Sequence, residues 1–302
     1  MSLTYGFCSY EGDMPLFYDI MSFFMVPFYV FSGYLFSSKR SIKDYIRNRS
    51  RKLLLPYLFF AILSLVVYYI SVYIVNEDVN FLWPYNQFIT TAGLGSNTPL
   101  WFLFSLYIVS VFYYIIDKIF LKYKVLIIFI CFVFAFIVHN RLQILSWGNI
   151  SLGLVYYHCG YEFRKYDDNK RYNNFLTFVG CVFIFILIVV FDRQNLAFVS
   201  LFQRRGLFIL NLPFSLAASY ILFYISEKIK CIPCINYIGC YSLVLFASHR
   251  VILNWIYDPL IMRLIPNISF LPYVIIGISV ILFFYILILL PLKKYFPKII
   301  GL

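Results

Sequence analysis

Nine long apolar stretches run through this chain of 302 residues, and they constrain its fold more than any other feature. A helix satisfies its own backbone hydrogen bonds in lipid, and crossing the hydrocarbon takes ~20 mostly apolar residues. We therefore expect an all-α protein, a polytopic transmembrane helical bundle that forms a single domain over residues 1–302. The expected spans are 17–36, 53–75, 100–117, 125–138, 144–163, 175–191, 207–226, 237–256 and 270–291.

The composition supports a membrane protein and excludes several other classes. Apolar residues make up 63% of the chain and charged residues 13%, whereas soluble domains usually have ~45–50% and ~25%. A soluble enzyme could not hide so much apolar surface, and a disordered interaction protein needs the opposite balance. The net charge of +12 does not indicate a nucleic-acid partner, because too little polar surface remains to form a solvated basic face. The expected partner is the lipid bilayer.

The basic residues predict how the spans are oriented. Nineteen of the 25 lie in alternate connections, after the first, third, fifth, seventh and ninth spans. Cytoplasmic loops of membrane proteins carry this excess of Lys and Arg. The pattern places the loop at 37–52 and the C-terminus in the cytoplasm, and the N-terminus of the given chain outside. The loop at 37–52 holds the densest group: Lys39, Arg40, Lys43, Arg47, Arg49, Arg51 and Lys52.

The N-terminal segment fits this orientation poorly. Residues 1–16 would lie outside, but they contain no signal that would carry them across the membrane. One further helix before Met1, running from inside to outside, would resolve the conflict. We therefore expect that the chain lacks its first span.

Ionisable residues inside spans are the first candidates for chemistry, because their burial in lipid is costly. His249 and Arg250 lie within the span 237–256. A buried His either forms a hydrogen bond within the bundle or handles protons, and both alternatives stay open. Asp19 lies near the outer end of the first span. It is either an interfacial carboxylate in water or a group directed at a substrate or a catalytic His.

Two further groups have a functional and a purely structural explanation. Arg47, Arg49 and Arg51 alternate just before the second span. They either set the topology or bind the phosphates of a cofactor, which guanidinium groups contact in a bidentate way. Trp101 lies near a predicted outer end, where it either belongs to an interfacial aromatic belt or stacks on a sugar. The pair Cys231 and Cys234 has no second pair nearby, and we predict no metal site.

Several short motifs resemble the acyltransferase 3 family of integral-membrane O-acyltransferases, and within it the fucose 4-O-acetylases. They occur in family order and cover residues from about 20 to 256 with spacing that fits the hydropathy. The motifs are FFMVPF (23–28), FSGYLF (31–36), RKLLLPYLFF (51–60), PLWFL (99–103), LVYYHCGY (154–161) and IGCYSL (238–243) with His249. The family usually opens with a helix that carries its catalytic His. By this resemblance we expect that the chain begins after that helix, and it has Phe24 where the motif usually has His.

The resemblance implies a reaction in which an acyl group moves from acetyl-CoA, as co-substrate, to a sugar hydroxyl of a cell-surface polysaccharide. A His would remove the hydroxyl proton during the attack, which makes His249 and Asp19 the catalytic candidates. Arg47, Arg49 and Arg51 would contact the donor, which would pass Ser32 and Gly33, where a missing side chain permits close approach. The alternative for Ser32 and Gly33 is tight helix packing. The acceptor would be a surface glycan or a lipid-linked sugar, and the location the bacterial inner membrane.

Two other functions remain compatible with the residues, and a third is disfavoured. One is a glycan transporter or flippase without chemistry, and another is a truncated, inactive relative, since the first-helix His is not visible. The third is a polysaccharide polymerase, which we would expect to have a large external loop containing Arg and His. The longest external loop expected here, 76–99, has no Arg or Lys. The acyl group, the sugar and the oligomeric state are not specified by these residues.

Overall fold

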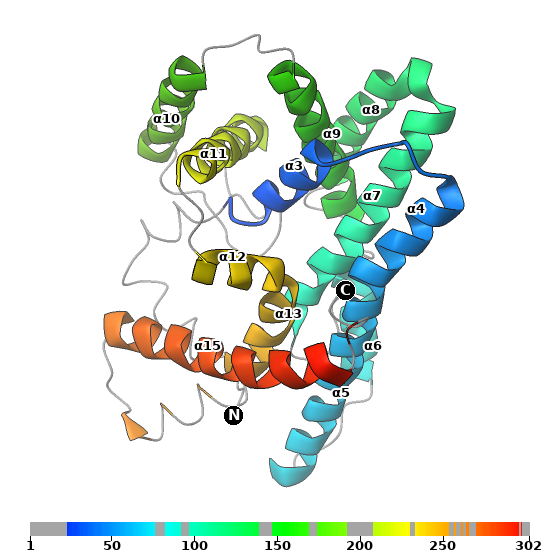
Figure 1. The fold of residues 1–302 in the computed structure, drawn as a ribbon. Coiled ribbons are helices and arrows are strands. Elements are labelled where there is room, and N and C mark those ends of the chain that lie inside the picture. The colour runs from blue at the N-terminus through cyan, green and yellow to red at the C-terminus, as the bar shows by residue number, and fades with distance from the viewer. Residues whose placement is uncertain are drawn as a thin grey trace. The chain divides into compact units, whose positions relative to one another are not determined.

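The computed structural model is described over most of the chain, and every element in the described part is helical (Figure 1). This confirms the prediction of an all-α fold. The described residues are 23–75, 82–91, 97–138, 147–168, 174–191, 208–229, 233–253, 257, 261, 264, 265, 270–295 and 297.

Four helices in the described ranges are long and apolar enough to cross a membrane, by length and composition. They support a membrane location for the chain. The number of nine spans and the predicted orientation stay predictions. The four helices cover Ile42–Ile70, Trp101–Ile119, Leu121–Val138 and Pro272–Tyr295.

The chain divides into two compact units. Unit 1 consists of Met1–Met14, Ser50–Phe104 and Pro233–Leu302. Its elements are the π-helix η1 (Ser50–Leu54), α5 (Leu55–Val75), α6 (Leu82–Thr91), the 3₁₀ helix η2 (Thr98–Leu100), the start of α7 (Trp101–Ile119), α12 (Pro233–Cys240), α13 (Ser242–Ile252) and α15 (Phe270–Tyr295). Helix α13 packs against α5, η2 and α15, and a buried core joins Tyr257 to Tyr273 of α15.

Unit 2 consists of Pro15–Arg49 and Ser105–Ile232. Its elements are α3 (Val26–Tyr34), α4 (Ile42–Arg49), the remainder of α7, the 3₁₀ helix η3 (Leu121–Tyr123), α8 (Lys124–Val138), α9 (Trp147–Asp168), α10 (Asn174–Phe191) and α11 (Phe208–Lys228). Helix α3 packs on α9 and on α11, while α8 packs on α9 and α10 on α11 (Figure 1).

Two glycines allow α3 and α9 to cross at close range. A Cβ atom on Gly33 would lie 1.9 Å from the carbonyl oxygen of Tyr157, and one on Gly160 would lie 1.9 Å from that of Val30. Both contacts are far shorter than a van der Waals distance, so only glycine fits at either position. Small residues serve this purpose between membrane helices.

The predicted spans agree with the helices within a few residues at α5, α7, α8, α10 and α11. The segment 37–52, expected as a loop, is different because most of it is helical. Ser41 caps α4: its hydroxyl accepts a hydrogen bond from the Asp44 backbone N–H at 3.2 Å and donates one to the Asp44 carboxylate at 2.7 Å. Helix α4 then continues through η1 into α5. Pro56 lacks the N–H that a regular α-turn needs at this point, which accounts for the wider turn of η1.

Three other boundaries differ from expectation. Helix α6 lies inside the loop expected at 76–99. Helix α9 continues to Asp168, so Arg164 and Lys165 extend the helix instead of following it. The span expected at 237–256 is interrupted at Tyr241, whose backbone (φ −113°, ψ 17°) separates α12 from α13. Residues 254–256 lie outside the described ranges.

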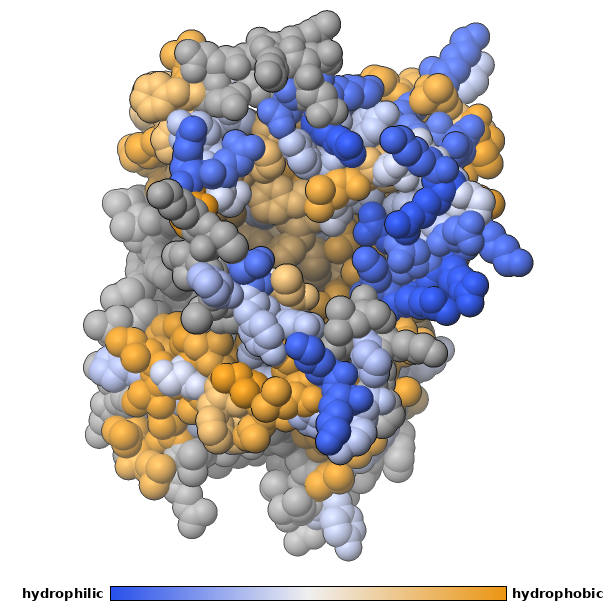
Figure 2. Space-filling view, in the orientation of Figure 1, coloured by the Kyte–Doolittle hydropathy of each residue, from blue (hydrophilic) through white to orange (hydrophobic). Residues whose placement is uncertain are grey.

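Apolar side chains cover much of the outer surface. Phe183 and Val190 on α10 are 66% and 61% exposed, and Figure 2 shows hydrophobic residues gathered over α15. Such a surface is stable against lipid hydrocarbon and unfavourable in water. Hydrophilic residues instead gather over α4 (Figure 2), which is the segment with the dense basic group.

Candidate active site

The residues predicted to form the site fall into both units. His249, Trp101 and Arg51 belong to unit 1, while Arg47, Arg49, Ser32 and Gly33 belong to unit 2. Asp19 and Cys231 lie outside the described residues. Each unit therefore presents a separate cluster.

His249 lies near the end of α13, where it is partly buried. Its Nδ1 atom is 2.5 Å from the carbonyl oxygen of Phe246, and its ring is 5.7 Å from the Phe246 ring. A carbonyl accepts hydrogen bonds only, so this contact assigns the ring proton to Nδ1. The other nitrogen, Nε2, is then the one with a lone pair. The arrangement therefore gives His249 the tautomer of a general base.

Two polar atoms on or against α13 are buried without a hydrogen-bond partner in the described part of the chain: Arg250 Nε and Asn97 Oδ1. The Asn97 side-chain amide donates to the Ala247 carbonyl at 2.7 Å, which fixes Asn97 against α13. Ala247 and Arg250 are three residues apart and share one face of the helix. An unpaired buried polar atom costs ~1–3 kcal/mol. Arg250 and Asn97 thus offer one unused donor and one unused acceptor on this face of α13, while His249, which adjoins Arg250 in sequence, points to another side of the helix; we refer to these three residues as the His249 cluster.

Trp101 begins α7, directly after η2. It is 4% exposed, and its ring meets the Phe102 ring edge-on at 6.2 Å. A tryptophan that stacks on a sugar must present a ring face. The burial of Trp101 favours a packing role, and the prediction that it binds substrate finds no support in its exposure.

The three arginines predicted to bind a cofactor do not share one environment. Arg47 and Arg51 are exposed, whereas Arg49 is partly buried. Arg49 Nε donates to the Tyr45 hydroxyl at 3.3 Å, and Nη2 of the same side chain donates to the Tyr157 hydroxyl at 3.5 Å. Within the described ranges, Arg49 forms no ion pair with a carboxylate. Arg49 is thus a partly buried cation that lacks a carboxylate partner there.

Aromatic packing holds this arginine in place. The ring of Tyr45 stacks on the Tyr114 ring with centroids 4.4 Å apart, and the Tyr114 hydroxyl donates to the Arg40 carbonyl at 2.6 Å. Phe36, which is 2% exposed, lies against both tyrosines and against Tyr157. These contacts fix α4 against α7 and α9 and leave the Arg49 guanidinium little freedom.

A second polar group in unit 2 was not predicted from the sequence. His158 Nδ1 lies 3.0 Å from the Tyr113 hydroxyl and 4.0 Å from Glu162. The carboxylate of Glu162 also accepts a hydrogen bond from Lys165 at 2.9 Å. Desolvation lowers the pKa of Lys165, but the hydrogen bond to Glu162 and the attraction of nearby acidic groups together leave the pKa above its ordinary value. Glu162 follows His158 by four residues, a spacing from which this contact could have been expected.

Next to this group, a buried ion pair joins α7 to α8. Lys124 Nζ lies 2.7 Å from Asp117 Oδ1 and 3.8 Å from the centre of the Tyr161 ring. A charge in an apolar surrounding is retained only with such partners. Because each charge of this pair is compensated, Lys124 is less suited than Arg49 to bind a further anion.

Gly33 lies in tight contact with the neighbouring helix α9. The space that its missing side chain leaves is filled by the Tyr157 backbone, which favours the packing alternative over a passage for a donor. Ser32 is partly buried beside it.

Comparison with known proteins gives the class of the chain. A family model described as an acyltransferase domain, that of acyltransferase 3, matches residues 4–291. This protein belongs to the acyltransferase 3 family. No curated protein and no solved structure matches the chain.

Membership confirms the resemblance seen in the motifs and assigns the chain to the membrane acyltransferases. The fucose 4-O-acetylase subtype stays a prediction. For an acyltransferase, His249 offers a base, and Arg250 and Asn97 offer unused hydrogen-bonding atoms on the same helix region. Arg49 with Tyr45 and Tyr157, here called the Arg49 cluster, offers a cation held in a fixed position. Sequence reasoning identified His249 and Arg49, but it missed Asn97, whose position depends on a contact across 150 residues.

Proposed function

We propose that this acyltransferase moves an acetyl group from acetyl-CoA to a sugar hydroxyl of a cell-surface polysaccharide. The observation that carries the proposal is the His249 cluster in a chain of this family. A sugar hydroxyl is a poor nucleophile at neutral pH, and a base that removes its proton during attack accelerates transfer. His249 has the tautomer that this role requires.

Apart from one proton transfer, the proposed reaction forms one carbon–oxygen bond and breaks one carbon–sulfur bond. His249 Nε2 accepts the hydroxyl proton while the hydroxyl oxygen bonds to the thioester carbonyl carbon. The carbon–sulfur bond then breaks, and the proton passes to the departing thiolate of CoA. The Arg250 guanidinium, with an unused Nε donor, would stabilise the negative charge on the carbonyl oxygen. Asn97 Oδ1, an unused acceptor, would receive a hydrogen bond from the acceptor sugar.

The activity can be tested directly with purified protein in liposomes. Acetyl-CoA carrying a radiolabelled acetyl group, offered together with a deacetylated surface polysaccharide, is expected to give labelled polysaccharide that loses its label in mild alkali, as an ester does. Deleting the gene should also remove O-acetyl groups from the surface polysaccharide of the cell. Unchanged acetylation combined with failed export would contradict the proposal and favour the transporter alternative.

Among the three arginines, Arg49 is the one we propose to bind a phosphate of the donor. Replacing Arg49 with Gln is expected to weaken acetyl-CoA binding by about 10-fold or more, because a hydrogen bond to a charged group contributes ~1.5–3 kcal/mol. Isothermal titration of the detergent-solubilised protein measures the change. The loss is expected because Tyr45 and Tyr157 hold the Arg49 guanidinium in place and no carboxylate in the described ranges pairs with it.

Arg47→Gln is the matched control for this measurement, since Arg47 is exposed on the same helix. It removes the same charge and is expected to leave binding nearly unchanged. Equal losses in both variants would indicate a general electrostatic effect of α4 and contradict the assignment to Arg49. The thermal midpoint of each variant separates lost binding from lost folding.

A further inference from the structure

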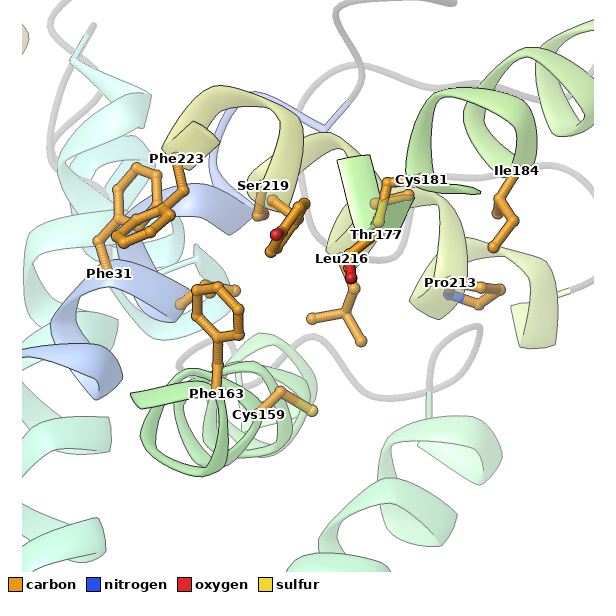
Figure 3. Close-up of a pocket in the computed structure, with 13 residues that line it drawn as sticks. Phe31, Cys159, Phe163, Thr177, Cys181, Ile184, Pro213, Leu216, Ser219 and Phe223 are labelled. Atoms are coloured by element: carbon orange, nitrogen blue, oxygen red, sulfur yellow. The ribbon is translucent and has the colours of Figure 1, made fainter. Parts of the chain in front are cut away.

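Unit 2 contains an apolar cavity of about 370 Å³ between α3, α9, α10 and α11 (Figure 3). The rings of Phe31, Phe163 and Phe223 lie at one end, and Ile184 and Pro213 lie at the other (Figure 3). Cavities of ~300–1,000 Å³ are typical of ligand sites in proteins. Neither the His249 cluster nor the Arg49 cluster includes any of these residues, so the proposed chemistry does not use the cavity wall.

The polar groups in the wall are already paired. The Ser219 hydroxyl donates to the Ser215 carbonyl at 2.7 Å, and the hydroxyls of Thr177 and Tyr220 form a hydrogen bond with each other. The remaining wall is mainly aromatic and aliphatic, with the two thiols of Cys159 and Cys181. A polar ligand would lose its water here without gaining partners. The wall is therefore suited to a hydrocarbon.

The surroundings of the cavity indicate which hydrocarbon is available. Helix α10 contributes Thr177, Cys181 and Ile184 to the wall. The same helix exposes apolar side chains elsewhere on its surface, such as Phe183 and Val190. In a membrane protein this outer face contacts lipid chains. Lipid chains are thus the apolar molecules present at high concentration next to the cavity.

One end of the cavity offers a cation for a lipid head group. Lys228 Nζ lies 5.5 Å from the centre of the Tyr224 ring, and this ring stacks on Phe178 with centroids 4.5 Å apart. Phe178 follows Thr177 of the cavity wall. Lys228 is exposed and follows Phe223 by five residues at the end of α11. A phosphate can bind an ammonium group placed in this way.

We infer that the cavity is a binding site for one acyl chain of a membrane phospholipid, whose phosphate lies near Lys228. The acyl chain would fill the space between α3, α9, α10 and α11. Without it, the side chains of the cavity wall would lack dispersion contacts on one side. The site would hold a resident lipid and would do so independently of acyl transfer.

The two cysteines in the wall provide a direct test on the unaltered protein. Delipidated protein is treated with N-ethylmaleimide, with or without added dioleoyl phosphatidylglycerol, and labelling is followed at each cysteine by peptide mass spectrometry. Lipid is expected to slow the labelling of Cys159 and Cys181 several-fold. Cys131 on α8, which is outside the cavity wall and also partly buried, is the internal control and should be unaffected.

A cavity-filling variant gives a second readout. Ala217 lines the cavity, and Ala217→Phe is expected to lower the fraction of protein that retains one phospholipid in native mass spectrometry. The control is Val190→Phe, which also introduces a phenylalanine but on the exposed face of α10. Lys228→Gln should reduce retention of anionic phospholipid while both thiols stay protected by an excess of lipid.

Three results would overturn the inference: equal labelling with and without phospholipid, preferential protection by a polyprenyl phosphate, or protection by acetyl-CoA. The second would identify the occupant as an isoprenoid carrier, and the third would assign the cavity to the donor. All readouts measure binding without any reaction. Failure of this inference is therefore distinguishable from failure of the proposed acetyl transfer.

Discussion

His249→Gln is expected to lower acetyl transfer by about 10²–10⁴-fold, the range that a positioned general base contributes. Glutamine has similar length and can keep a hydrogen bond to the Phe246 carbonyl, but it cannot accept a proton at neutral pH. Radiolabelled acetyl transfer in liposomes measures the loss. Binding of acetyl-CoA should persist in the variant, because the substitution leaves the Arg49 cluster of unit 2 intact.

His158→Gln is the matched control for the His249 substitution. His158 is also a partly buried helical histidine, and it contacts Tyr113 and Glu162. We expect its replacement to change transfer by a small factor only, since no unpaired polar atom of the described residues lies on its helix, α9. If transfer survived in His249→Gln and disappeared in His158→Gln, the base would have to be reassigned to unit 2.

The second large effect concerns the crossing of α3 and α9. Gly33→Ala and Gly160→Ala are each expected to destabilise the protein by at least the ~1–3 kcal/mol that overpacking typically costs. The added methyl group would meet a backbone carbonyl at 1.9 Å in both cases. Backbone atoms of a packed helix cannot move aside as a flexible side chain can, so the helices would have to separate. The thermal midpoint and the monodisperse fraction in detergent measure the loss.

Gly180→Ala is the control for both glycine variants. Gly180 lies inside α10, and a Cβ atom there would meet nothing within 4 Å. Alanine is the better helix former by about 1 kcal/mol, so this variant should be as stable as the original protein or slightly more stable. A wild-type midpoint in Gly33→Ala would contradict the close crossing.

The helices themselves were largely predictable from the sequence. The apolar segments of α5, α8 and α10 are local properties, since the length of an apolar run alone decides whether it can cross lipid. Helix α4 could also have been predicted, because Ser41 and Asp44 have the spacing of a capping box. The dense positive charge of this segment instead suggested a loop. Helix α6 is short and its apolar residues follow no clear helical period, so the sequence did not predict it.

The candidate sites were predictable only in part. His249 attracted attention because an ionisable residue within an apolar span is costly. The three arginines near residue 49 were treated alike, although successive alternate positions on a helix point to different sides. The structure places only Arg49 against Tyr157, a contact across 108 residues. Trp101 was expected at a surface and is buried instead.

By itself, the sequence determined that this protein is a helical membrane acyltransferase, because hydrophobic length and short motifs are written in consecutive residues. Only the tertiary structure decided that Gly33 meets Tyr157, that Asn97 meets Ala247, and that four helices of unit 2 enclose an apolar cavity. The physical reason is that these features are contacts between segments far apart in the chain. Such contacts depend on which faces of the helices pack together, and no single segment specifies its partner.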